Sequence, residues 1–151
     1  MKDHFTPSDD LLTKTIHQFW ETVPPLWHHI RARISQEARE SFKLTHQQFH
    51  ILRRIHKGWT SVSGLAEAKH ISRPAASRTV DVLVEKGLVT RTQNTEDRRH
   101  IYLALTPEGE ATLKAIFEHV TAWMSEKLGV LEENELQDII TSMDALHRAF
   151  H

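Results

Sequence analysis

The sequence predicts a mainly α-helical fold with a small β-wing, in which a central module is flanked by helical arms. Apolar residues recur at helical spacing over most of the 151 residues, whereas strict alternation of apolar and polar residues occurs only around residues 99–105. The 39% apolar content is enough for a packed core, and the length suits one domain covering residues 1–151. We therefore expect several helices and one hairpin.

The first helical arm is expected in residues 8–41, where apolar side chains repeat every three or four positions. Pro24 and Pro25 interrupt this pattern, and proline removes a backbone donor and clashes with the preceding turn. The sequence therefore predicts a helix over Ser8–Thr22, a break or kink, and a second helix over Leu26–Ser41.

The second helical arm is expected in residues 107–150. Thr106 followed by Pro107 has the spacing of a helix N-cap and a first-turn proline. Gly129 is expected to interrupt the helix that starts there, and Glu132–Phe150 to form the last one.

Three shorter helices are expected in the central module, residues 44–106: Thr45–Lys57, Gly64–His70 and Arg73–Lys86. Each start carries a side chain that can cap it, namely Thr45 (with Gln48 as its capping-box partner), Ser63 and Ser72. Gly87 has the position of a C-terminal stop.

A β-hairpin is expected directly after the third of these helices, with strands Val89–Gln93 and Arg99–Leu105. Alternation predicts that Ile101, Leu103 and Leu105 face the core. Two helices joined by a turn and followed by a hairpin are the layout of a winged helix-turn-helix.

The net charge of −1 is unevenly distributed along the chain. Residues 69–99 carry seven Lys and Arg against four Asp and Glu, whereas residues 108–151 carry three against nine. Location matters more than the total, because the field that attracts phosphate decays within a Debye length of about 8 Å. The helix-and-hairpin segment is therefore the part suited to nucleic acid, and the acidic tail should face away from it.

The helix after Ser72 is expected to bury Ala76, Val80, Leu83 and Val84 and to leave Arg73, Ser77, Arg78 and Asp81 free. The first residues of a recognition helix meet base edges in the DNA major groove, and the guanidinium fork matches the two acceptors of guanine. The alternative is an ordinary amphipathic helix with a solvated face. The candidate contacts on this helix are Ser72, Arg73, Pro74, Ala75, Ser77, Arg78 and Thr79.

The tip of the expected hairpin places Asp97 two residues before Arg99, a spacing that lets the carboxylate orient the guanidinium. An arginine held in this way suits a narrow minor groove, whose negative potential attracts it. Arg91 and Arg98 flank the tip as expected phosphate contacts. The alternative is a surface ion pair without function.

These residues resemble the MarR family of bacterial winged-helix transcription regulators. The likeness is carried by the stretches Leu44–Phe49, Ser72–Arg78, Asp97–Arg99 and Leu105–Gly109. The resemblance implies helical dimerisation arms (residues 8–41 and 107–150), a homodimer on a near-palindromic double-stranded operator, and repression released by a small, often phenolic, effector. It also assigns the wing arginine to Arg99 and its orienting acid to Asp97.

A second copy of the chain is the expected cover for the apolar faces of the arms, because a monomer would leave them in water. The alternative is that the arms fold back onto their own central module. An aromatic pocket for an effector is expected between arms and module, although the same residues also suit a plain core. Its candidates are Trp20, Trp27, His28, Arg31, Phe49 and Trp123.

Other functions find little support in the sequence. There is no phosphate-binding glycine loop or nucleophile motif, so no enzyme is expected, and no cofactor is implied. The lack of cysteine excludes disulfides and thiolate metal sites, and fits a cytoplasmic protein. His46 and His50 have metal-sharing spacing without an evident third ligand, which leaves a metal-responsive regulator as one alternative and a protein-binding winged helix as another.

Overall fold

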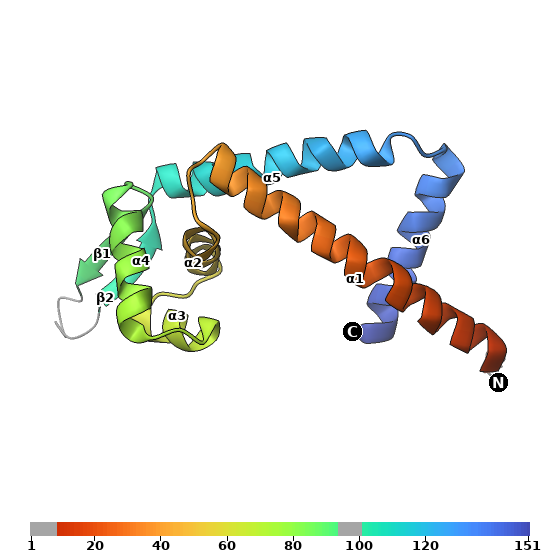
Figure 1. Cartoon of the computed structure of the whole chain (residues 1–151), viewed down its shortest axis with the longest axis horizontal. Coiled ribbons are helices and arrows are strands. Elements are labelled where there is room, and N and C mark those ends of the chain that lie inside the picture. Colours follow the sequence, from red (N-terminus) through yellow and green to blue (C-terminus); the bar gives the residue numbers. More distant parts are fainter. Residues whose placement is uncertain (1–8, 94–100) are drawn as a thin grey trace.

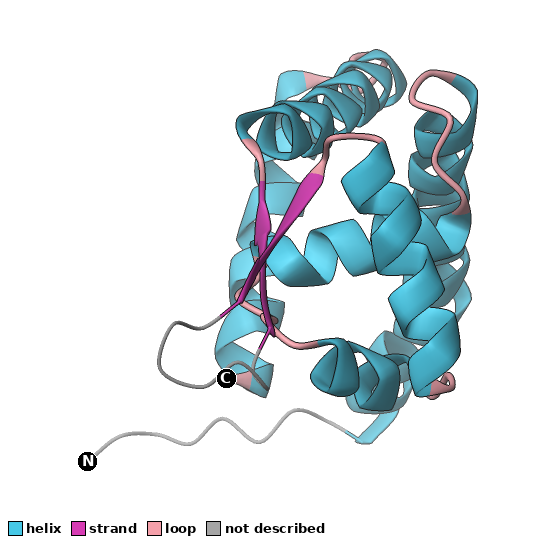
Figure 2. Ribbon diagram, turned by 90° about the vertical axis from the view of Figure 1, so that its left-hand side faces the viewer, coloured by secondary structure: helices cyan, strands magenta, loops and turns pink. Residues whose placement is uncertain are grey.

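The computed structural model describes residues 9–93 and 101–151. Helices dominate, and one antiparallel hairpin lies among them (Figure 1, Figure 2). The elements are α1 (Asp9–Glu40), α2 (His46–His56), α3 (Val62–Lys69), α4 (Arg73–Glu85), β1 (Val89–Gln93), β2 (Ile101–Leu105), α5 (Pro107–Leu128) and α6 (Glu133–Phe150). The predicted mainly helical winged fold is confirmed.

The central module lies at one end of the molecule, and the helical arms extend away from it (Figure 1). Its core is built from side chains of α2, α3, α4 and the hairpin, among which Phe49, Leu52 and Leu83 are fully buried. Ala38 of α1 and Ile116 of α5 are buried in the same cluster. The near ends of two arms are therefore part of the core of the central module and fix the arms to it.

The helix starts of the central module follow the predicted capping chemistry with one correction. The Thr45 hydroxyl accepts a hydrogen bond from the Gln48 amide, and the Gln48 side chain accepts one from the Thr45 amide. At α3 the cap is Ser61, not Ser63, because Ser61 has extended backbone angles and its hydroxyl accepts from the Gly64 amide at 3.1 Å. Ser63 lies inside the first turn.

The predicted break at Pro24 and Pro25 is wrong, since α1 continues through both residues. Each proline removes one hydrogen bond to the carbonyl four residues earlier, on Trp20 and Glu21. Both of those residues are exposed, so water can donate to the freed carbonyls. The cost of the two prolines is thereby reduced, and the first arm is one helix.

The end of α4 sets the path into the hairpin. Gly87 has a φ of 72°, and the amides of Gly87 and Leu88 donate to the carbonyls of Val84 and Leu83. This is a Schellman ending, with Leu88 buried beneath it. Val84, by contrast, is 36% exposed and lies at the margin of the buried stripe instead of within it.

The hairpin pairs Val89 with Leu105 and Gln93 with Ile101. Leu103 is buried, and its amide donates to the Thr60 carbonyl, which ties the hairpin to the loop before α3. The expectation that Ile101 faces the core is wrong, because its side chain is 42% exposed at the end of the paired strands farthest from the α5 junction.

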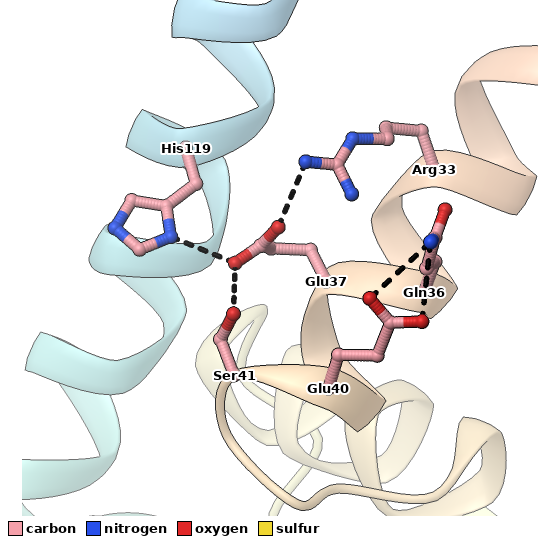
Figure 3. A network of polar contacts seen from close by, with 6 residues as sticks. All are labelled: Arg33, Gln36, Glu37, Glu40, Ser41 and His119. Atoms are coloured by element: carbon pink, nitrogen blue, oxygen red, sulfur yellow. Dashed lines mark hydrogen bonds and ion pairs between the residues drawn. The ribbon is translucent and has the colours of Figure 1, made fainter.

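A buried carboxylate joins the two arms where they leave the module (Figure 3). Glu37 of α1 accepts hydrogen bonds from the Ser41 hydroxyl at 2.5 Å and from His119 Nδ1 of α5 at 2.7 Å, and pairs with Arg33 at 3.0 Å. The bonds from Ser41 and His119 hold the pKa of Glu37 below its usual value. The network fixes the crossing of α1 over α5.

The far parts of the arms are largely unburied. No residue of α6 is buried, and Met143 and Phe150 are 53% and 72% exposed. In α1, Leu11 and Trp20 are 56% and 66% exposed. None of the helices formed by the described residues combines the length and hydropathy of a membrane span.

Candidate nucleic-acid interface

Helix α4 presents a basic surface over a buried stripe. Ala76, Val80 and Leu83 are completely buried against the module. The side of α4 turned to solvent exposes Arg73 and Arg78. The Ser72 hydroxyl caps the helix by accepting from the Ala75 amide at 3.3 Å. Of the other predicted contacts, Pro74 is exposed and Ala75 and Ser77 are half-buried.

Thr79 is held between α4 and α2. Its hydroxyl donates to the Ala75 carbonyl and accepts from Gln47 Nε2, both at 3.0 Å. The sequence predicted Thr79 as a candidate DNA contact and assigned no role to Gln47. The only sequence signal for Gln47 was its position in the first turn of a helix that packs on α4.

Arg91 of β1 is joined to the opposite edge of α4. Its guanidinium pairs with the Asp81 carboxylate at 3.0 Å and donates to the Ser77 hydroxyl and carbonyl at 3.2 and 3.4 Å. The prediction that Ser77 and Asp81 are free is therefore wrong, because the hairpin brings the Arg91 guanidinium onto both. Asp97, Arg98 and Arg99, the predicted tip contacts, lie outside the described residues.

The predicted effector residues fall into two groups. Trp27, Arg31 and Phe49 line one hollow between α1 and α2, together with His50 and Arg53. Its cavity volume of about 20 Å³ holds roughly one water molecule.

The remaining three lie elsewhere. Trp20 is 66% exposed in edge contact with Phe19, His28 is exposed on α1, and Trp123 packs against the core.

His46 and His50 form a close pair on α2, with ring centroids 4.2 Å apart. No group of three or more possible metal ligands occurs in residues 9–93 and 101–151. Burial, followed by the nearby charge of Lys69, lowers the pKa of His50 to about 4. The folded protein therefore favours a neutral His50.

This pKa predicts an acid-sensitive contribution to stability. The folded pKa of His50 lies below the ordinary 6.5, so between pH 6.5 and 4 the unfolded chain binds the proton more readily than the folded protein. The stability that neutral His50 contributes is therefore complete above pH 6.5 and declines as the pH falls toward 4. We expect the free energy of urea unfolding to fall less between pH 6.5 and 4 in His50→Gln than in wild type, by about 1–2 kcal/mol after allowance for solvent screening. Replacing the exposed His29 by Gln should leave the profile unchanged, and an unchanged profile for His50→Gln would contradict the assignment.

Comparisons with known proteins agree with this geometry. Residues 44–101 match the sequence model of the MarR family. The HTH-type transcriptional repressor MdtR of Bacillus subtilis is 35% identical over 101 residues, which are 66% of this chain and 65% of MdtR.

Two solved structures share the fold. The transcriptional regulator Tm0710 of Thermotoga maritima has a TM-score of 0.81 at 19% identity, over 88% of this chain and 94% of its own. A MepR variant of S. aureus bound to an oligodeoxyribonucleotide has a TM-score of 0.69 at 19% identity, over 88% and 98%.

Proposed function

We propose that this member of the MarR family is a DNA-binding transcriptional regulator and not an enzyme. In this proposal it acts in the cytoplasm as a homodimeric repressor, and a small effector releases it from its operator. The proposal combines a reading surface on α4, a dimer formed by the arms, and an effector site at the hollow beside Trp27. Each part is supported by different residues.

The observation that carries the proposal is the exposed start of α4. Arg73 and Arg78 project from a helix whose opposite side is buried, as a helix entering a major groove requires. Both arginines suit guanine or phosphate, and the nearby Pro74 and Ala75 are small enough for close approach. In this proposal Asp97, Arg98 and Arg99 supply a minor-groove contact from the wing. The repressor MdtR and the DNA-bound MepR make DNA the expected ligand.

The dimer is supported by exposed apolar faces on both arms. Helix α6 has no buried residue, and its apolar side chains and those of the far half of α1 lie open to solvent. Phe150 stacks on Phe19, with ring centroids 6.3 Å apart, so the two faces adjoin. A symmetric second copy supplies an apolar surface of matching size and spaces two α4 helices for one duplex.

A charged residue in the apolar face of α6 should therefore dissociate the dimer. We expect Met143→Glu to convert the protein to monomers in light scattering and to lower operator affinity by about 100-fold, because one recognition helix is lost from each complex. Ala145→Glu adds the same charge on the other side of α6 and should remain dimeric. A dimeric Met143→Glu variant would contradict the arm-mediated dimer.

The effector is proposed to be a small aromatic anion. Trp27 and Phe49 offer ring contacts, and Arg31 and Arg53 offer positive charge at the same hollow. Because the hollow holds about one water, the effector must widen it, moving α1 relative to α2. This movement would change the spacing of the two reading surfaces.

The test is selection of genomic DNA fragments by the purified protein, repeated with aromatic carboxylates. We expect a near-palindromic sequence, affinity that falls steeply with salt, and release by at least one carboxylate. Weak, salt-independent binding would overturn the proposal and favour a protein-binding module. Release by zinc instead of carboxylates would favour the metal-responsive alternative built on His46 and His50.

A further inference from the structure

Helix α4 is held from both sides of its buried stripe by polar contacts. On one side Gln47 of α2 donates to Thr79, and on the other Arg91 of β1 bonds to Ser77 and Asp81. Ser77 and Asp81 are four residues apart and so lie on one edge of the helix. The guanidinium of Arg91 spans both.

Arg91 is an internal brace, by which we mean that its side-chain contacts with Ser77 and Asp81 tie β1 to α4. One terminal nitrogen, Nη1, lies 3.0 Å from the Asp81 carboxylate, and the other, Nη2, lies 3.2 Å from the Ser77 hydroxyl. Only 29% of the Arg91 side chain is exposed, although its neighbours on β1, Thr90 and Thr92, are open to solvent. Because both terminal guanidinium nitrogens of Arg91 contact α4, few of its N–H groups are left to donate to a phosphate.

We propose that Arg91 is a positioning residue for DNA recognition, which sets the rotation of α4 through Asp81 and Ser77 instead of contacting DNA. The inference rests on the proposed function, since it assumes that the exposed face of α4 reads DNA. Arg73 and Arg78 share α4 with Asp81, so a rotation of the helix would move both from their groove contacts. A small displacement of these arginines weakens binding to the specific operator more than binding to other DNA.

The two possible roles of Arg91 predict opposite effects for Asp81. If Arg91 contacted phosphate, Asp81→Asn would remove a repelling charge and strengthen binding. If Arg91 is a brace, Asp81→Asn frees the guanidinium and weakens binding despite that charge change.

The experiment measures fluorescence anisotropy with a labelled duplex selected by the wild-type protein from a random library, and with a scrambled duplex. For Asp81→Asn and Arg91→Gln we expect about a three- to tenfold loss of affinity for the selected duplex only. The combined variant should be no weaker than Arg91→Gln alone. Arg91→Lys keeps the charge but loses the fork, and should also weaken selected binding.

Salt dependence provides a second readout. The slope of log affinity against log salt should stay at the wild-type value for Arg91→Gln and become shallower by about one for Arg78→Gln, the comparison variant. Melting curves followed by circular dichroism identify any variant that fails to fold. If Arg91→Gln fails to fold, the test uses Arg91→Lys, which is the smallest change at this position.

The possible failures are distinguishable. Tighter binding by Asp81→Asn, or a shallower salt slope for Arg91→Gln, would overturn the brace and assign Arg91 to a phosphate. A wild-type protein that fails to distinguish selected from scrambled duplex would overturn the proposed function itself.

Discussion

Replacing Arg73 and Arg78 together by alanine should lower affinity for the selected operator by on the order of 100- to 1,000-fold. These two guanidinium groups are the exposed cations of the α4 surface, and neither lies in the contacts that hold α4 to the module. Truncation should therefore remove DNA contacts without loosening the fold. The measurement is an affinity titration at two salt concentrations, with a melting curve for each variant.

Arg39→Ala is the matched control for this double variant. Arg39 is exposed in the last turn of α1. That turn lies at the end of the module opposite the start of α4 (Figure 1). We expect its operator affinity to match wild type. The control removes one positive charge and the double variant removes two. A control loss of about half the double variant's loss in binding free energy would therefore show that only net charge matters, and would contradict a localised reading surface.

Gly109→Ala should destabilise the fold more than a change to alanine at any other glycine of the described residues. A Cβ at Gly109 would lie 2.1 Å from the Leu88 carbonyl oxygen, which is backbone and cannot rotate away. The first turn of α5 packs directly on this carbonyl, which also accepts from the Thr106 amide at 3.1 Å. We expect a loss of about 2–3 kcal/mol in urea unfolding, because the helix start must move from Leu88.

The control is Glu108→Ala in the same turn. Its side chain is exposed, so the loss should stay within about 0.5 kcal/mol and reflect only the favourable acidic charge at the helix start. A Gly109→Ala variant as stable as Glu108→Ala would contradict the close packing of α5 on Leu88.

Local features were predictable from the sequence because their causes are local. The caps at Thr45, Ser72 and Thr106 and the stop at Gly87 each depend on residues within a turn of the helix end. The helix order and the hairpin followed from these signals together with apolar spacing. The exposed arginines of α4 followed in turn from the position of its buried stripe.

Features that depend on contacts distant in sequence were not predictable. Arg91 reaches Asp81 only because the hairpin folds back along α4, and Gln47 reaches Thr79 across 32 positions of sequence. Ile101 fits the alternation yet is exposed, since the core does not extend to that end of the hairpin. Continuity of α1 through Pro24 and Pro25 likewise depends on exposure of the carbonyls that they leave unpaired.

The central claim is that two copies of the α4 surface read neighbouring major grooves of one duplex. Dimethyl sulfate footprinting on the selected operator tests it most directly, because the reagent methylates guanine N7 in the major groove. We predict two clusters of protected guanines about one helical turn (~34 Å) apart, both lost with the Arg73 and Arg78 alanine variant. A single cluster, or protection that survives in that variant, would contradict the claim.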